Sequence, residues 1–215
     1  MRNLEKLRHA SSRKVVLEKR KRVLKFYPSI YGFLLHDLAF FFFSLLFFQT
    51  SPPISPKKRI MNEIKGRKIL KQFGIKTTQL ISFSLKEKFL EEKLEEKALT
   101  LDDLEMINPK KASRVVMKIG KITKKLNEKN IYFIDNRASN WMYNKSLIRT
   151  DLELLKKSKR SKRFFIFCDI LSFISTLKSE KIKEKFLEGY GEKIKISTIL
   201  QLLVMIYIRF TDIIF

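Results

Sequence analysis

The sequence is poor in cysteine, histidine and glycine, and each scarcity excludes a kind of site. The single cysteine, Cys168, rules out an intramolecular disulfide and permits an intracellular setting. The two histidines, His9 and His36, cannot form a metal cage by themselves, and no zinc-type ligand spacing is present. No glycine precedes Gly32, so the amino-terminal region has no glycine-rich loop for binding phosphate.

Acidic residues are scarce relative to basic ones. The chain has 46 Lys and Arg against 22 Asp and Glu, which gives a net charge of +24 over 215 residues. Such an excess favours an anionic partner, such as nucleic acid, nucleotide phosphates or an anionic membrane surface. A solvated lysine-rich surface explains the same composition, so the charge alone does not name the partner. The length suffices for one domain with a substantial core or for two small packed lobes.

Long apolar runs are confined to two places. Residues 33–48 (FLLHDLAFFFFSLLFF) are followed by a proline-rich stretch that breaks any helix, and they fall short of the about 20 apolar residues that span a bilayer. A buried helix, a helix in the membrane interface and an inserted hairpin all remain open, and flanking basic residues suit anionic headgroups. Residues 196–215 contain Arg209 and Asp212, which favour a packing helix or a membrane-surface anchor over a span.

The first 22 residues are dense in charge and have no apolar core. No cleavable signal peptide is therefore expected at this end of the sequence. Together with the single cysteine, this pattern predicts a cytoplasmic protein, with peripheral attachment to a membrane as an option through the apolar runs.

The most informative stretch is Ile131–Leu152, whose centre is typical of a β-hairpin. The apolar run Trp141–Tyr143 precedes a polar Asn144-Lys145 turn, and Ser146–Arg149 supplies the second strand. This turn predicts four cross-strand pairs: Tyr143 with Ser146, Met142 with Leu147, Trp141 with Ile148, and Asn140 with Arg149.

Oxygen-bearing side chains are expected to gather at the ends of this hairpin. The predicted register sets Asn140 and Asp151 on adjoining strand ends. Asp135 enters from a preceding strand, Ile131–Ile134, five residues before Asn140. Two carboxylates and a carboxamide are hard oxygen ligands that suit Mg²⁺. Asp135 and Asn140 could also form a simple turn after a buried strand, since both residue types favour turns.

The segment Asp135–Asn140 (DNRASN) resembles the catalytic loop of protein kinases, in which Asn follows Asp at the fifth position. Thr150-Asp151-Leu152 stands where those kinases carry a metal-binding Asp-Phe-Gly triplet. The chain is similar to small atypical kinases, namely KEOPS-associated kinases, RIO-type kinases and lipopolysaccharide-core sugar kinases. With gaps, the resemblance extends from about residue 15 to about residue 190.

The resemblance implies roles for four residues of this stretch. Asp135 would accept or orient the proton of an acceptor hydroxyl, and Arg137 would steady the γ-phosphate. Asn140 and Asp151 would hold Mg²⁺, or Mn²⁺, across the phosphates of ATP. Departures from the kinase pattern are Phe133, Asn136, Leu152-Glu153 and the missing glycine-rich loop.

In the amino-terminal half, the resemblance implies a nucleotide site. Lys25, in the run Val23–Tyr27, looks like the lysine that holds the α- and β-phosphates. Glu63 is the only acidic residue of the predicted helix Lys57–Phe73 and resembles the glutamate that pairs with that lysine. Without the resemblance, Lys25 is an edge-strand lysine and Glu63 a surface acid. By position at the hinge between lobes, the adenine-binding candidates are Glu92, Lys93 and Leu94.

Residues 87–97 allow two interpretations. A strand leading into the hinge is one, and a charged helix is the other. Like charges at Glu92 and Glu96, and at Glu91 and Glu95, would repel each other in a helix and so favour the strand.

Two later helices are predicted from apolar stripes. Asn108-Pro109 opens a helix with Val115, Ile119, Ile122 and Leu126 on one face, which indicates packing and not chemistry. A second stripe, from Phe167 to Leu177, contains Asp169, which is costly to bury unless it finds hydrogen-bond donors. The resemblance implies that Asp169 anchors the backbone of the catalytic loop.

These patterns, with the resemblance, predict an α+β, two-lobed protein-kinase-like fold with extra apolar helices. Residues 1–98 would form a reduced N-terminal lobe with an apolar insertion at about 30–56, and residues 99–215 a mainly helical C-terminal lobe with the catalytic-loop hairpin. The predicted function is ATP- and Mg²⁺-dependent phosphoryl transfer to a hydroxyl of a protein, sugar or RNA-linked acceptor. Alternatives are a pseudokinase acting within a protein complex, or a basic protein that binds RNA or a membrane surface.

Overall fold

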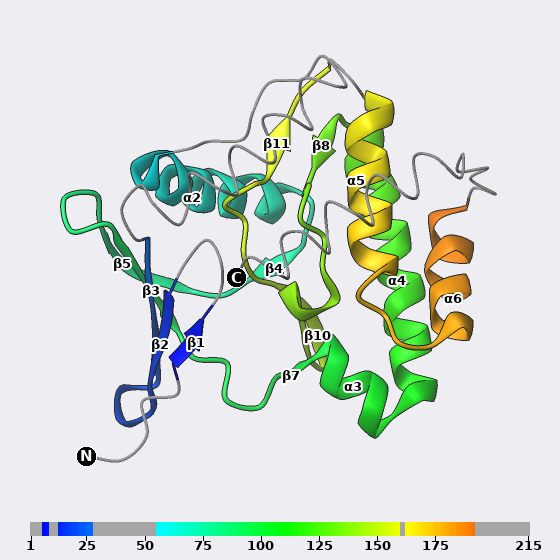
Figure 1. Ribbon diagram of the computed structural model, residues 1–215, viewed down its shortest axis with the longest axis horizontal. Coiled ribbons are helices and arrows are strands. Elements are labelled where there is room, and N and C mark those ends of the chain that lie inside the picture. The colour runs from blue at the N-terminus through cyan, green and yellow to red at the C-terminus, as the bar shows by residue number, and fades with distance from the viewer. Residues whose placement is uncertain (1–5, 9–12, 28–54, 160–161, 192–215) are drawn as a thin grey trace. The chain divides into compact units, whose positions relative to one another are not determined.

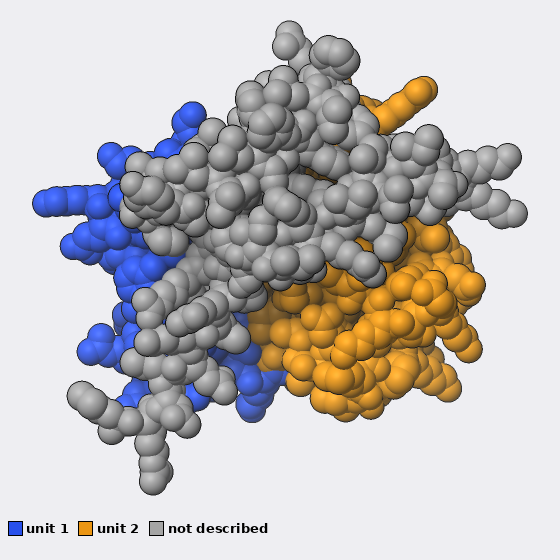
Figure 2. Space-filling view, in the orientation of Figure 1, with its two compact units in different colours: residues 1–97, 207–215 blue, residues 98–206 orange. Residues whose placement is uncertain are grey.

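The computed structural model describes residues 6–8, 13–27, 55–159 and 162–191 (Figure 1). The chain divides into two compact units, residues 1–97 with 207–215 and residues 98–206 (Figure 2). The apolar runs 33–48 and 196–215, on which the predicted insertion and the predicted extra helices fall, lie outside the described residues. Within the described ranges, no helix combines the length and the apolar character needed to cross a bilayer.

The first unit contains an antiparallel sheet with the strand order β1-β2-β3-β6-β5 among the described residues. Its strands are β1 (Lys6–Arg8), β2 (Arg13–Leu17), β3 (Arg22–Phe26), β6 (Phe89–Lys93) and β5 (Leu80–Ser84). Strands at Lys14–Leu17 and Arg22–Tyr27, which the kinase resemblance implies, are confirmed as β2 and β3. For residues 87–97, the strand interpretation is confirmed by β6, and the interpretation as a charged helix is wrong.

Turns in this unit use the left-handed backbone region. The short helix η1 (Glu18–Arg20) joins β2 to β3, and Lys21 follows it at φ 51°. The short strand β4 (Lys76–Thr77) follows the helix α2. Lys25 lies on β3, the central strand of the sheet, and pairs with Leu90 of β6.

Helix α2 (Pro56–Gln72) begins one residue before the predicted start, and its sequence explains both ends. The Ser55 hydroxyl accepts a hydrogen bond from the backbone amide of Lys58 at 3.2 Å, and proline occupies the first helical position. Gly74 follows the helix with φ 69°, a conformation that glycine adopts without strain. Ile60 of α2 packs with Tyr27 and Leu90 to form an apolar core.

The second unit is mainly helical. Its helices are α3 (Leu101–Ile107), α4 (Pro109–Glu128), α5 (Lys162–Ile174) and α6 (Glu180–Tyr190). The Thr100 hydroxyl caps α3 by accepting from the Asp103 amide at 3.2 Å. The Asn108 side chain caps α4 in the same way through the Lys111 amide at 3.0 Å.

Helices α4 and α6 pack against each other at a pair of glycines. A β-carbon on Gly120 would lie 2.8 Å from the Tyr190 backbone nitrogen, and one on Gly189 would overlap the backbone of Met117. Both glycines therefore permit a backbone approach that a side chain would block. The apolar stripe of α4 faces inward as predicted, with Val115, Ile119 and Leu126 buried and Ile122 half-buried.

Short strands carry the polar loop of this unit. Strand β8 (Ile131–Tyr132) pairs with β11 (Lys156–Lys157), and β9 (Trp141–Asn144) pairs with β7 (Leu99–Thr100) and with β10 (Ser146–Arg149). The 3-10 helix η2 (Ala138–Asn140) precedes β9.

The predicted hairpin is present, but its predicted register is wrong by one residue. Ser146 pairs with Asn144 and Arg149 with Trp141, and Lys145 alone forms the turn at φ 56°. Cross-strand partners share a face, so Arg149 lies with Trp141 and not with Asn140. Its guanidinium stacks over the rings of Trp141 at 5.3 Å and Phe133 at 4.6 Å. The predicted register, with Ile148 opposite Trp141, would separate this buried cation from the Trp141 ring.

Candidate active site

The candidate residues fall into two groups, one in each unit. In the first unit, Lys25, Glu63, Arg67 and Glu92 form a buried ion cluster, with none of the four more than 9% exposed. The Lys25 ammonium lies 3.0 Å from one Glu63 oxygen, which is the pairing expected from the sequence. It also lies 3.5 Å from Glu92. Strands β3 and β6 and helix α2 thus contribute charges to one site.

Arg67 is the member of this cluster that the sequence analysis missed. One guanidinium nitrogen lies 3.1 Å from Glu63 and also bonds to Glu92. Another donates to the Thr78 carbonyl and, at 3.0 Å, to the Thr78 hydroxyl. Burial opposes the charge on Arg67, but the attraction of Glu92 and Glu63 outweighs it and raises the pKa of Arg67. Its spacing of four residues from Glu63 was the available signal.

The three hinge candidates are placed differently from one another. Glu92 turns its side chain into the ion cluster, whereas Lys93 and Leu94 do not join it. The Lys93 amide donates to the Gln79 carbonyl at 2.9 Å, and the Leu94 amide donates to the Lys21 carbonyl at 2.8 Å. Adenine binding through these two amides would compete with existing backbone bonds, and the adenine role stays a prediction.

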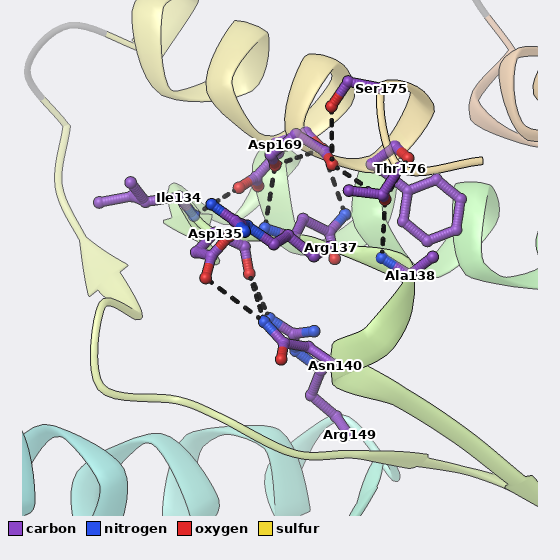
Figure 3. A network of polar contacts seen from close by, with 12 residues as sticks. Ile134, Asp135, Arg137, Ala138, Asn140, Arg149, Asp169, Ser175 and Thr176 are labelled. Atoms are coloured by element: carbon purple, nitrogen blue, oxygen red, sulfur yellow. Dashed lines mark hydrogen bonds and ion pairs between the residues drawn. The ribbon is translucent and has the colours of Figure 1, made fainter. Parts of the chain in front are cut away.

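In the second unit, the Asp135–Asn140 loop brings together three of the predicted side chains (Figure 3). The Asp135 carboxylate accepts from the Arg137 Nε at 2.9 Å and from the Asn140 amide nitrogen at 3.4 Å. Asn140 also donates to the Asp135 carbonyl at 3.3 Å. The Asp135 side chain remains 35% exposed, so its carboxylate is held in place but reachable.

Helix α5 and the turn that follows it hold the backbone of this loop, and Figure 3 shows Asp169 of the helix and Thr176 of the turn. Asp169 accepts from the amides of Phe133 at 3.2 Å and Ile134 at 2.6 Å, which confirms the predicted anchoring role. The Ser172 hydroxyl accepts from the Asn136 amide at 2.9 Å, and the Thr176 hydroxyl accepts from the Ala138 amide at 3.0 Å.

Ser172 and Thr176 were not found from the sequence. They follow Asp169 at three and seven residues, the spacing of one helix face, and that polar spacing within an apolar stripe was the available signal.

Burial sets the protonation of this anchor. It raises the pKa of Asp169 to about 7, although the hydrogen bonds from Ile134 and Phe133 and the charge of Arg149 lower it. Burial also raises the pKa of the neighbouring Cys168 thiol.

Two further contacts fix the loop from the hairpin side. Arg149, fully buried, donates to the Asp135 carbonyl at 2.6 Å. The Trp141 indole donates to the Asn136 side chain at 2.9 Å. Sequence reasoning treated Arg149 only as a strand residue, because its role depends on the register that was predicted wrongly.

The backbone next to Asp151 is hydrogen-bonded to Asn140. The Thr150 amide and hydroxyl both donate to the Asn140 carbonyl, at 2.9 and 3.2 Å, and Asp151 follows at φ 55°. A non-glycine residue in the left-handed region is uncommon, and such conformations concentrate at functional sites.

The donor chemistry of Asn140 and Asp151 fits Mg²⁺. The nitrogen of the Asn140 amide donates to the Asp135 carboxylate at 3.4 Å, so the amide oxygen would be the atom that binds a metal ion. Mg²⁺ commonly takes one or two protein carboxylates and completes its shell with water and phosphate oxygens. Among the described residues, no group of three or more His, Cys, Asp or Glu is placed to hold a metal ion.

The sheet and α2 of the first unit, with the helix-anchored loop and hairpin of the second, define an α+β protein-kinase-like fold, and comparison with solved structures shows it. WaaP, solved in complex with acyl carrier protein, is 11% identical with a TM-score of 0.52 over 100% of this chain and 88% of that chain. Choline kinase LicA from Streptococcus pneumoniae is 12% identical with a TM-score of 0.56 over 95% of this chain and 79% of that chain.

LicA in complex with AMP gives a TM-score of 0.53 at 12% identity, over 95% of this chain and 78% of that chain. These neighbours match the atypical kinase-like group that the sequence resembles, and at such identities they show the fold alone. No protein-family model matches the chain, and no curated protein matches it.

Proposed function

We propose that this protein is a phosphotransferase that uses ATP and Mg²⁺ to phosphorylate a hydroxyl group. The observation that carries the proposal is the Asp135 carboxylate, which is reachable from solvent while its loop is bonded to α5 and to Arg149. Phosphoryl transfer requires little covalent chemistry from a protein and depends on positioning and charge. A partly exposed carboxylate on a backbone fixed at five points suits that task.

Each candidate residue has a role in the proposed reaction. Asp135 accepts or orients the proton of the acceptor hydroxyl, and Arg137 holds Asp135 in place and steadies the transferred phosphate. Asn140 and Asp151 would hold Mg²⁺, or Mn²⁺, which neutralises charge on the phosphates when bound. Lys25, held by Glu63, contacts the phosphates nearer the nucleoside.

The nucleotide and the acceptor of the proposed reaction are inferred with the help of the structural neighbours. The AMP complex of the neighbour LicA supports a nucleotide site in this fold. The adenine candidates stay Glu92, Lys93 and Leu94, with the carboxylate of Glu92 committed to the ion cluster. Choline kinase and a partner of acyl carrier protein are among the structural neighbours. We therefore add a small hydroxyl compound, free or carried by a protein, to the proposed acceptors, which are a protein, a sugar or an RNA-linked group.

Turnover in matched variants tests the proposal. ADP formation and autophosphorylation are measured with Mg²⁺ for the wild type and for the Asp135→Ala, Asp151→Ala and Ser139→Ala variants. Ser139 is exposed in the same loop and takes no assigned part, so its substitution should leave turnover unchanged. We expect a loss of at least about 100-fold in both aspartate variants. Nucleotide binding without any turnover would indicate the pseudokinase instead.

A second candidate function, binding of a nucleic-acid backbone, is favoured by one face of α4. Lys110, Arg114, Lys118 and Lys121 are exposed along that face and, in the part of the chain that the structure describes, form no ion pair or hydrogen bond. They recur every three or four residues, or roughly 5–6 Å along the helix axis. On α6, by contrast, Lys183 and Lys185 pair with glutamates.

The partner that this row suits is a phosphate backbone. A membrane-surface helix needs an apolar face for the lipid, and the apolar stripe of α4 is buried within its own unit. The exposed face of α4 would therefore bind a partner through its positive charge alone, as proteins do in sequence-independent contacts with nucleic acid.

Salt-dependent binding of a single-stranded RNA separates this function from simple net charge. One variant changes Lys110, Arg114, Lys118 and Lys121 to Gln, and a control changes four exposed lysines of α2, Lys58, Lys65, Lys68 and Lys71. The α4 variant should lower the slope of log affinity against log salt by about 3, at about 0.7 per lost phosphate contact. Equal losses in both variants would contradict the site, and binding only to phosphatidylserine vesicles would favour a membrane instead.

A further inference from the structure

The buried ion cluster holds more charge than a lysine–glutamate pair requires. Lys25 and Glu63 balance each other at 3.0 Å, but the Glu92 carboxylate lies 3.5 Å from the same ammonium and is itself buried. Glu92 lies two residues after Leu90 on β6, so it shares a face of the strand with the residue that pairs with Lys25 across the sheet. A second carboxylate at this distance would cancel the charge that Lys25 needs to attract phosphate.

Arg67 offsets that second carboxylate. It bonds to Glu92 and, at 3.1 Å, to Oε2 of Glu63, whereas Lys25 lies 3.0 Å from Oε1. With Arg67 the four residues sum to zero charge, and without it Lys25 would share a site with two carboxylates and a net charge of −1. Charges within a few ångströms interact strongly at low dielectric, so one uncompensated charge changes the local potential for an anion.

The position of Arg67 is itself fixed by neutral groups. Its second terminal nitrogen donates to the carbonyl and hydroxyl of Thr78, which holds the guanidinium between the two glutamates. A planar guanidinium can bond in two directions at once, which an ammonium on a flexible stem does less well. The arrangement therefore fixes Glu63 from one side while leaving Lys25 to hold it from the other.

We propose that Arg67 is a positioning residue for nucleotide binding. It neutralises Glu92 and fixes Glu63, so that the Lys25 ammonium keeps its charge for the phosphates of the nucleotide. The inference rests on the proposed function, because it requires Lys25 to contact phosphate. It assigns to Glu92 a tuning role that a Lys25–Glu63 pair alone does not have.

Charge rescue tests the inference. The dissociation constants of ATP and of adenosine are measured by calorimetry for the wild type and for the Arg67→Met, Glu92→Gln and Arg67→Met/Glu92→Gln variants. Arg67→Met should weaken ATP binding by on the order of tenfold and leave adenosine binding within about twofold, because only phosphate senses the charge. The double variant, again neutral, should restore ATP binding to within about threefold of the wild type.

The outcomes are separable from those of a merely structural role. If Arg67→Met weakens ATP and adenosine equally, or if Glu92→Gln fails to restore ATP binding, the inference is overturned. Where Arg67→Met does not fold, Glu92→Gln alone must strengthen ATP binding, since it raises the charge of the cluster by one. A wild type that turns over ATP with unchanged Arg67→Met binding overturns this inference only, whereas a wild type that binds no ATP overturns the proposed function as well.

Discussion

Asp169 is one residue on which the geometry of the Asp135–Asn140 loop depends. Its carboxylate bonds to two consecutive amides immediately before Asp135, and it lies wholly inside the second unit. A carboxylate in such a place is bonded well but desolvated, and the two effects oppose each other. The loop is thus anchored by a group whose charge depends on pH.

The stability of the protein should therefore depend on pH through Asp169. The pKa of Asp169 is about 7 in the folded state against an ordinary 3.8, so between these values the folded state keeps a proton that the unfolded state has lost. Stability from this residue is greatest at low pH and falls as the pH rises toward 7, by at most about 1.4 kcal/mol per pH unit.

Urea unfolding of the wild type and of Asp169→Asn checks this expectation. Between about pH 5 and about pH 8, the wild type should lose on the order of 2 kcal/mol relative to the variant, which cannot titrate. Parallel stability curves would show that Asp169 does not titrate in this range.

Arg149 is the second residue on which the loop depends. It is fully buried, stacks over Phe133 and Trp141, and donates to the Asp135 carbonyl. Arg149→Met should lower the free energy of unfolding by about 2–4 kcal/mol, because it removes a charged hydrogen bond and a cation–π contact. Denaturant titration measures the loss. Lys145→Met, at the exposed turn of the same hairpin, is the control, and an equal effect in both variants would refute the role of Arg149.

At the scale of elements, the contact between α4 and α6 depends on two backbones lying close together. Gly120 and Gly189 each lie against the backbone of the other helix, where no side chain can move aside. Gly120→Ala and Gly189→Ala should each destabilise the protein by about 1–3 kcal/mol through overpacking. This cost exceeds the gain of up to about 1 kcal/mol that alanine brings to a helix.

Thermal unfolding measures this effect. Lys121→Ala changes the exposed face of α4 beside Gly120 and should shift the melting temperature little. Glycine variants as stable as the wild type would mean that α4 and α6 lie further apart than described.

Prediction of secondary structure from the sequence succeeded for two helices and failed for the register of the hairpin. Helices α2 and α4 were predicted because capping residues and apolar periodicity act locally, and the chain carries both signals. The hairpin register failed because a turn of one residue and a turn of two differ little in sequence. The observed register allows a tertiary contact, the stacking of Arg149 on two rings, that the sequence of the turn does not reveal.

Site residues divide in the same way. The pairing of Lys25 with Glu63 and the anchoring by Asp169 were expected from a motif resemblance, and the contacts are present. Arg67, Ser172 and Thr176 were missed, because each acts through partners that the fold brings from distant parts of the sequence. In a chain with 46 basic residues, the spacing of Arg67 from Glu63 does not by itself distinguish a buried arginine from a surface one.

For the whole molecule, the kinase-like fold is shown by solved structures at 11–12% identity, while the reaction is a proposal. Fold and function are separate claims, since one fold hosts several chemistries. The two groups of candidate residues lie in different compact units of the chain. We propose phosphoryl transfer from ATP as the reaction that both groups serve.

The measurement that tests this claim most directly is the rate of ADP formation by the folded wild-type protein, with and without Mg²⁺. We expect a rate that saturates with ATP and that chelation of the metal abolishes, because Asn140 and Asp151 would hold the nucleotide phosphates through the ion. No ADP above the background of a heat-unfolded sample, from protein whose circular dichroism shows native helix content, would contradict it.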